Sequence, residues 1–139
     1  MQLDIRKPLP EEFETISQLI NYAFSVEPLP LASDFFKDPK INCFIAVAND
    51  EILGTASLHI IQKNNRKMGL IEDVVVAPNS QGKGIGKKLI HELIQSAEKI
   101  GCYKTILNST VSNQVFYEKL GFSKEQIQNE KENLAASTQ

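Results

Sequence analysis

The chain has little of what several classes of protein require. Only two of its 139 residues are cysteine and two are histidine, and their spacing fits no metal site. We expect both cysteines, Cys43 and Cys102, to be reduced residues that pack in the interior. No apolar run approaches the roughly 20 residues that span a bilayer, and a net charge of −2 gives no basis for binding nucleic acid or an anionic membrane. The sequence therefore predicts no metal, no nucleic acid and no membrane as partners.

The composition is that of an ordinary globular protein. Hydrophobic residues make up 42% and charged residues 23% of the sequence, which is enough apolar material for one core. The sequence has no repeat, low-complexity segment or linker, so we expect residues 1–139 to form a single domain with a polar tail at 128–139. The first residues, 1–4, have no basic start and no apolar signal core, which predicts a cytoplasmic location.

Hydrophobic periodicity and turn residues predict elements in the order β, α, α, β, β, β, α, β, α, β. The expected strands are residues 3–6, 42–48, 52–62, about 67–77, 103–107 and 122–127. Four helices are expected. The first begins at Glu11, the second covers residues 34–37, the third ends near residue 100, and the fourth runs from a cap at Ser112 to Gly121. This order predicts an α+β fold of the three-layer α/β type, in which helices flank a mixed, mostly antiparallel sheet of about six or seven strands.

The most informative motif is a glycine-rich segment between a predicted strand and a predicted helix, Gln81-Gly82-Lys83-Gly84-Ile85-Gly86. A turn from strand into helix leaves several backbone N–H groups without partners in the helix, and the helix dipole makes that end positive. Glycines let the main chain approach an anion closely, while Lys83, Lys87 and Lys88 add positive charge. We therefore expect a phosphorylated ligand at the start of this helix.

The glycine spacing separates three kinds of phosphate-binding loop. A nucleotide-triphosphate P-loop needs Lys-Ser or Lys-Thr after its second glycine, whereas Gly82-Lys83 is followed by Gly84. A dinucleotide fingerprint needs Gly-x-Gly-x-x-Gly, whereas these glycines stand at every second position, midway along the chain. The remaining pattern, Gln/Arg-x-x-Gly-x-Gly/Ala, is matched in full by Gln81, Gly84 and Gly86.

With its surroundings, this loop resembles the pyrophosphate loop of the GNAT superfamily of N-acetyltransferases. Residues 69–90, GLIEDVVVAPNSQGKGIGKKLI, are similar to the superfamily core. Residues 101–104, GCYK, and 113–122, NQVFYEKLGF, resemble its glucosamine-6-phosphate N-acetyltransferase branch. The resemblance implies a GNAT fold, acetyl-CoA as the acetyl donor, and direct attack on the thioester by a small primary amine. The resemblance to this branch implies that the amine is an amino sugar phosphate such as glucosamine 6-phosphate.

The resemblance also implies how acetyl-CoA is held. Backbone N–H groups of residues 82–87 would bind the pyrophosphate. The preceding strand would carry a bulge, and the main chain of Val74, Val75 and Val76 would bond to the pantetheine arm as if to an added strand. The N–H of Val74, or of a neighbour, would polarise the acetyl carbonyl. Packing of the three valine side chains in the core is compatible with this role, because the function uses only main chain.

A further cofactor contact is implied on the helix after residue 112. Asn113 would bind the pantetheine or phosphate part of the cofactor, and Phe116 would contact it as well. Tyr117, one turn beyond Asn113, would give a proton to the departing CoA thiolate, for which a phenol is a suitable acid. The alternative is that Tyr117 is a half-buried packing residue, as tyrosines in helices often are.

Glu72 and Asp73 interrupt an apolar strand, where carboxylates cost desolvation free energy unless they are paired, hydrated or functional. As neighbours in a strand they would point to opposite faces unless a bulge intervenes. The resemblance places such a pair at the acceptor site, where one carboxylate attracts the substrate ammonium or helps to take its proton; a structural salt bridge is the alternative. Two further residues complete the expected acceptor site. Asn108 stands where the branch usually carries an acidic residue, and Arg66 is a candidate contact for a sugar phosphate.

Several points stay open at this stage. We expect His91 to be solvated and His59 to be a hydrogen-bonded sheet residue, although His59 could face the acceptor site. The chain after Phe122 offers no arginine for a sugar phosphate. The acceptor could therefore be another small amine or a peptide amine. A non-catalytic acetyl-CoA sensor and a nucleotide-binding regulator are alternatives of a different class. Neither cysteine has a visible base partner, which favours direct attack. Edge strands make a homodimer plausible.

Overall fold

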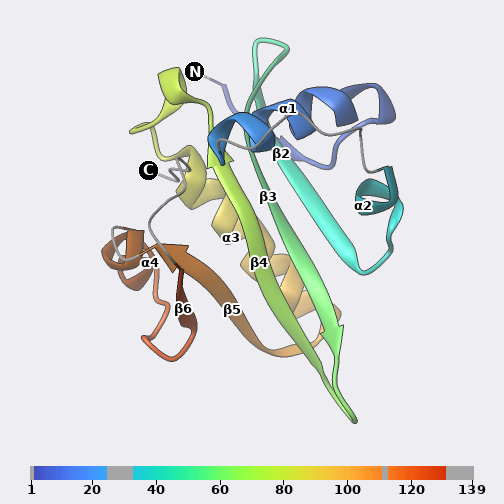
Figure 1. Ribbon diagram of the computed structural model, residues 1–139, viewed down its shortest axis with the longest axis vertical. Helices are drawn as coiled ribbons and strands as arrows, with labels where there is room; N and C mark the ends of the chain where they lie inside the picture. The colour runs from blue at the N-terminus through green and yellow to red at the C-terminus, as the bar shows by residue number, and fades with distance from the viewer. Residues whose placement is uncertain (1, 25–32, 111–112, 131–139) are drawn as a thin grey trace.

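The computed structural model describes residues 2–24, 33–110 and 113–130. Its sheet has six strands in the order β1-β2-β3-β4-β5-β6 (Figure 1). They are β1 (Asp4–Arg6), β2 (Ile41–Ala48), β3 (Glu51–Gln62), β4 (Lys67–Val76), β5 (Cys102–Thr110) and β6 (Ile127–Glu130). The first three pairings are antiparallel, while β4–β5 and β5–β6 are parallel. The mixed, mostly antiparallel sheet predicted from the sequence is confirmed.

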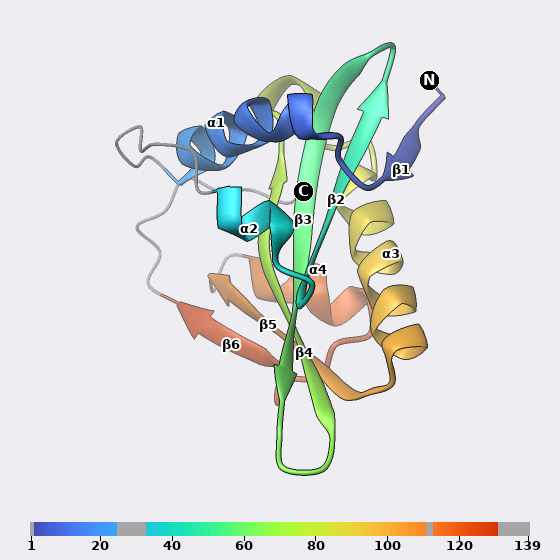
Figure 2. The ribbon, with the colours of Figure 1, turned by 90° about the vertical axis from the view of Figure 1, so that its right-hand side faces the viewer.

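Helices cover both faces of this sheet (Figure 2). α1 (Phe13–Ala23) and α2 (Ser33–Lys37) lie on one face, and α3 (Ile85–Ile100) lies on the other. A buried apolar cluster joins α3 to the sheet and includes Tyr117 of α4 (Gln114–Lys119). The helix expected from Glu11 begins two residues later, because a 3-10 turn, η1 (Pro10–Glu12), precedes it.

α3 forms where the periodicity predicted it. Its buried residues recur every three or four positions, as the apolar stripe of a helix on a sheet must: Ile85, Gly86, Leu89, Ile90, Leu93 and Ala97. Gly101 ends the helix in a left-handed conformation, φ +93°, and its N–H bonds to the carbonyls of Ala97 and Glu98. The strand β5 then begins at once, so α3 is held between two chain segments that belong to the sheet.

The last strand differs from the prediction. The expected strand 122–127 is instead a loop, and β6 begins where that strand was expected to end. The Gln126 side chain stabilises the loop, since its Nε2 donates to the Thr105 carbonyl at 2.9 Å and its Oε1 accepts from the Ser123 N–H at 2.9 Å. Residues 128–130 therefore belong to β6 and not to the expected polar tail; residues 131–139 and the predicted cap Ser112 lie outside the described residues.

The two cysteines differ in burial. Cys43 is buried as expected, whereas Cys102 is half-buried at the start of β5, and both are free thiols. Within the described residues, no three histidine, cysteine or acidic side chains gather as metal ligands would. No helix in the same part of the chain has the length and apolar character that crossing a bilayer would require.

Candidate active site

The glycine-rich turn connects the end of β4 to the start of α3. A short 3-10 turn, η2 (Pro78–Ser80), follows the strand, and the Gln81 side chain ties the turn back by donating to the Val76 carbonyl at 3.1 Å. Gly82 and Gly84 then take positive φ angles of 82° and 80°. Gly84 is the N-cap of α3, and no side chain caps the first turn of this helix. The turn therefore presents uncapped N–H groups at the positive end of a 16-residue helix.

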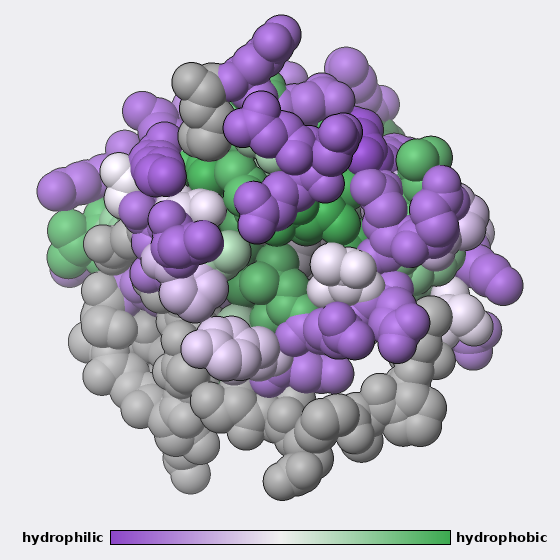
Figure 3. All heavy atoms as spheres, turned by 90° about the horizontal axis from the view of Figure 1, so that it is seen from above, coloured by the Kyte–Doolittle hydropathy of each residue, from purple (hydrophilic) through white to green (hydrophobic). Residues whose placement is uncertain are grey.

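Side chains around this turn divide into a buried and an exposed set. Ile85 is fully buried, so only its main chain faces the turn. Lys83, Lys87 and Lys88 are exposed. Seen from above, at the end of the molecule where β4 stops and α3 begins, apolar side chains are visible at the centre between hydrophilic ones (Figure 3). This combination suits a ligand with both anionic and apolar parts.

β4 parts from β5 before it reaches the turn. The parallel register between the two strands runs from Lys67 to Ile71 on β4 and ends at the pair Ile71–Leu107. Residues 74–76 continue towards the turn, beyond the last β5 pair of this register. Their backbone groups on that side are therefore not used in the β4–β5 ladder, as a strand-like ligand would require.

A β-bulge lies at the same place on β4. Thr55 on β3 pairs with Val75, but Ser57, two residues later, pairs with Glu72. Two residues, Asp73 and Val74, thus oppose a single residue of β3. Asp73 has a φ angle of 53°, which is uncommon for a residue with a side chain. The bulge implied by the family resemblance is present, and it lies at the carboxylate pair.

The bulge sets the surroundings of the two carboxylates. Glu72 pairs with Ser57, and Ser57 pairs with Cys43, which lines a cavity together with residues of α1 and α2; Glu72 therefore lies on the face that these helices cover. Burial raises the pKa of Cys43 and lowers that of His59, while the Asp73 charge adds to the first shift and opposes the second. The Asp73 charge thus acts on two residues of β2 and β3, and the bulge interrupts the regular alternation of β4 at this residue.

A short hydrogen-bonded network surrounds the Glu72 residue. Asn108 on β5 donates its Nδ2–H to Glu72 Oε1, and the Ser57 hydroxyl donates to the Glu72 carbonyl at 3.1 Å. The Ser57 oxygen also lies 3.1 Å from His59 Nε2. Burial lowers the pKa of His59, although Asp73 and Asp38 act in the opposite direction. Three of the four residues expected to bind the substrate, Glu72, Asp73 and Asn108, are therefore close together.

Arg66 is not part of this group. It precedes β4 at the far end of the strand, and its guanidinium lies over the Tyr103 ring at 4.2 Å from the centroid. Glu72 is six positions further along the strand, a distance of roughly 20 Å. The structure therefore gives Arg66 an aromatic partner and does not bring it to the carboxylates.

Tyr117 lies in the α3-side core. Its side chain is 3% exposed. Its ring packs edge-on against two phenylalanine rings, with centroid distances of 5.1 Å to Phe116 and 6.2 Å to Phe122. Asn113 precedes α4 and makes no capping hydrogen bond with its side chain. Tyr117 is thus buried more deeply than the half-buried packing residue of the alternative, and such packing is compatible with a role for its hydroxyl.

Ser57 is the residue that the sequence did not point to. It is 1% exposed within the apolar run of β3, and its hydroxyl is the one that bonds to the bulge. The available signal was a small polar side chain in a strand that is otherwise buried. Its pairing with residue 72 depends on the bulge, which no local pattern reveals.

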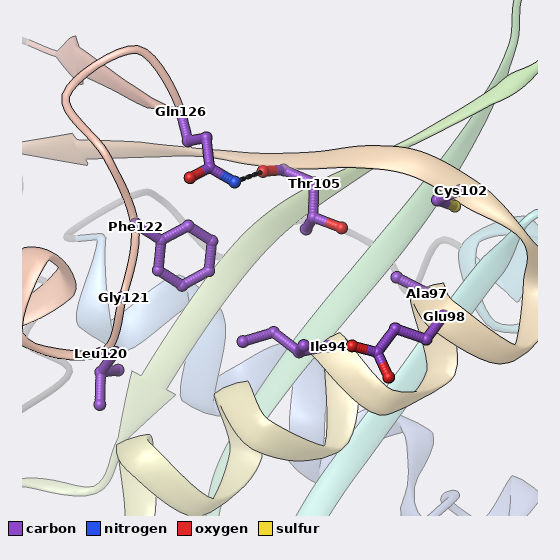
Figure 4. Close-up of a pocket in the computed structure, with 9 residues that line it drawn as sticks. All are labelled: Ile94, Ala97, Glu98, Cys102, Thr105, Leu120, Gly121, Phe122 and Gln126. Carbon is purple, nitrogen blue, oxygen red and sulfur yellow. Dashed lines mark hydrogen bonds between the residues drawn. The ribbon is translucent and has the colours of Figure 1, made fainter.

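A cavity of about 290 Å³ lies beside the second half of α3, away from the glycine-rich turn (Figure 4). Its walls are the second half of α3, the start of β5 and the loop before β6, with Phe122 and Gln126 contributing from that loop. Ile94 and Glu98 on α3 lie about 15–20 Å along the helix from its first residue, at about 1.5 Å per residue. This cavity therefore is not the space that the glycine turn and the carboxylates define.

Comparison with known proteins extends these observations. The family described as Acetyltransferase (GNAT) matches residues 6–122. A glucosamine 6-phosphate N-acetyltransferase of Arabidopsis thaliana is 41% identical over 97 residues, 67% of this chain and 65% of that protein. The chain thus spans just under two thirds of that relative. A glucosamine 6-phosphate N-acetyltransferase 1 of Dictyostelium discoideum is 34% identical over 122 residues, 83% of this chain and 78% of that protein. The crystal structure of a Trypanosoma brucei acetyltransferase, 33% identical, superposes with a TM-score of 0.82, covering 94% of this chain and 99% of that one.

The family match covers most of the chain and contains the features proposed to bind acetyl-CoA and the carboxylate pair. The bulge at Asp73, the divergence of β4 from β5 and the glycine turn at residues 81–86 all lie inside residues 6–122. The chain therefore belongs to the acetyltransferase (GNAT) family.

Proposed function

We propose that this chain is an acetyl-CoA-dependent N-acetyltransferase that acetylates glucosamine 6-phosphate by direct attack. The observation that carries the proposal is the bulge at Asp73, which holds two adjacent carboxylates where β4 leaves β5, just before an anion-binding turn. The names of the Arabidopsis and Dictyostelium relatives support the same acceptor.

Acetyl-CoA would occupy the turn and the open edge of β4. Its pyrophosphate would accept hydrogen bonds from the N–H groups of residues 82–87, with Lys83 and Lys87 adding charge. Its pantetheine arm would pair with the main chain of residues 74–76, which the β4–β5 register leaves without a partner. Asn113 and Phe116, near the start of α4, would contact the arm from the other side.

Catalysis would polarise the thioester and supply a proton to the leaving group. The Val74 N–H would bond to the acetyl oxygen, and loss of such a donor costs on the order of 10²–10³ in rate. Tyr117, next to Phe116 in the core, would protonate the CoA thiolate. Burial raises the pKa of both thiols, that of Cys43 to about 11, so neither cysteine supplies a thiolate nucleophile at neutral pH. This favours direct attack over an acyl-enzyme.

The acceptor amine would lie beside Glu72 and Asp73. Two adjacent carboxylates attract an ammonium group, and the Asn108 hydrogen bond orients the Glu72 side chain. Arg66 has no role in this proposal, because it lies at the other end of β4. The cytoplasmic location and the homodimer stay predictions from the sequence.

A panel of acceptors tests this proposal. Release of free CoA from acetyl-CoA would be followed with glucosamine 6-phosphate, glucosamine, a polyamine and a peptide with a free amino terminus. We expect kcat/KM to be highest for glucosamine 6-phosphate, by about tenfold or more over the sugar without phosphate. A preference for the polyamine or the peptide would replace the acceptor. Thermal stabilisation by acetyl-CoA without CoA release from any amine would replace the enzyme by a sensor.

A further inference from the structure

His59 and Ser57 form a polar pair that the proposed chemistry does not yet use. Both side chains project from β3 to the face that carries Glu72, since the Ser57 oxygen contacts both His59 Nε2 and the Glu72 carbonyl at 3.1 Å. Ser57 is fully enclosed, whereas His59 is half-buried and keeps contact with solvent. The pair therefore leads from the bulge towards the surface.

The Ser57 hydroxyl has one hydrogen and two acceptors within reach. In one orientation it donates to the Glu72 carbonyl and accepts from a protonated His59 Nε2; in the other it donates to an unprotonated Nε2. The Glu72 carbonyl and the Val74 N–H belong to consecutive peptide groups, so they lie within about 5 Å of each other. A hydroxyl that can switch partners is thus next to the place where the amine and the thioester would meet.

The groups around His59 suit a proton acceptor. Burial lowers the pKa of the imidazole, which keeps it unprotonated at neutral pH. Asp73 on β4 and Asp38 after α2 stabilise the protonated form, and Phe35 of α2 lies 5.9 Å from the ring. The Cys43 thiol on β2, opposite Ser57, stays neutral because burial raises its pKa to about 11.

We infer that Ser57 and His59 remove the proton that the acceptor ammonium must lose before it attacks acetyl-CoA. The ammonium gives a proton to the Ser57 oxygen while the Ser57 hydroxyl gives its own to His59 Nε2, so the amine keeps its electron pair. The imidazolium then releases a proton from Nδ1 to solvent. This inference rests on the proposed function, and it assigns His59 to the acceptor side of that reaction.

The test is the pH dependence of kcat/KM for the acceptor in His59→Gln and Ser57→Ala, with His91→Gln as the matched control. His91 is exposed on α3 and is the other histidine of the chain. At pH 7 we expect both β3 variants to lose about 100-fold in kcat/KM and His91→Gln to lose none. The deficit should shrink as pH rises through the pKa of the free amine, and it should be smaller for acceptor amines of lower pKa. Acetyl-CoA affinity should be unchanged in all three variants.

Each outcome has a defined meaning. A deficit in both β3 variants that stays constant with pH and with the amine would show a structural role and overturn the inference. Wild-type activity in His59→Gln would overturn the inference as well. If His59→Gln does not fold, the same measurement is made on Ser57→Ala, which is a smaller change, and wild-type activity there would overturn the inference. An inactive wild type with every amine would instead overturn the proposed function, and with it the role assigned here.

Discussion

Gly84→Ala tests the anion-binding turn, and Gly101→Ala is its matched control. The two glycines stand at opposite ends of α3 with φ angles of 80° and 93°, and a Cβ on either would meet nothing within 4 Å. They lie about 25 Å apart, at about 1.5 Å per helical residue. The two substitutions therefore impose the same local strain in two different places.

The expected stability change follows from the backbone alone. A left-handed conformation costs a residue with a Cβ roughly 1–2 kcal/mol, while the alanine restricts the unfolded chain and returns about 0.5 kcal/mol. Without ligand, both variants should lose about 1 kcal/mol in free energy of unfolding, or about 3–5 °C in Tm. Urea unfolding followed by circular dichroism measures this change.

The two variants are expected to differ in their affinity for acetyl-CoA. Only Gly84→Ala places a methyl group where the pyrophosphate would approach the N–H groups of the turn. Loss of one hydrogen bond to a charged group costs about 1.5–3 kcal/mol, which is about 10- to 150-fold in Kd. Isothermal titration calorimetry with acetyl-CoA should show this loss in Gly84→Ala and wild-type affinity in Gly101→Ala. Wild-type affinity in Gly84→Ala, or an equal loss in both variants, would refute the assignment of the turn.

Three further predictions concern other contacts. Asn108→Ala removes the donor to Glu72, so kcat should fall about 10- to 100-fold with acetyl-CoA affinity unchanged; steady-state kinetics that show the reverse would contradict the assignment to the acceptor side. Gly54→Ala places a Cβ 2.9 Å from a carbonyl oxygen of β4, where backbone cannot swing aside, and urea unfolding should show a loss of about 1–3 kcal/mol. A variant as stable as the wild type would argue against that close approach. The Arg6 hydrogen bond lowers the pKa of Glu12 from 4.5 to about 2, so this carboxylate stabilises the fold above pH 4.5 and loses its effect as the pH falls to 2. The stability difference between wild type and Glu12→Gln should shrink over that window, and a constant difference would contradict the ion pair.

Much of the fold could be predicted because local physics decides it. The apolar stripe of α3, the glycine at each of its ends and the alternating strands each depend on residues close in sequence. The start of β6 could not be predicted, because its place is set by a side chain, Gln126, that bonds to a carbonyl of β5 far away in the chain. Phe122 follows a helix-ending glycine and was therefore predicted to begin a strand, but it packs into the core from a loop.

For the site, local residue order was enough to predict an anion-binding turn, since spacing and glycine content decide where uncapped N–H groups and positive charge coincide. The bulge at Asp73 required tertiary structure, because only the pairing with β3 shows the extra residue in β4 that interrupts the alternation of the strand. The same holds for Ser57 with His59 and for the distance between Arg66 and Glu72. Sequence specifies which groups a strand carries, whereas pairing with β3 and β5 decides which of them meet.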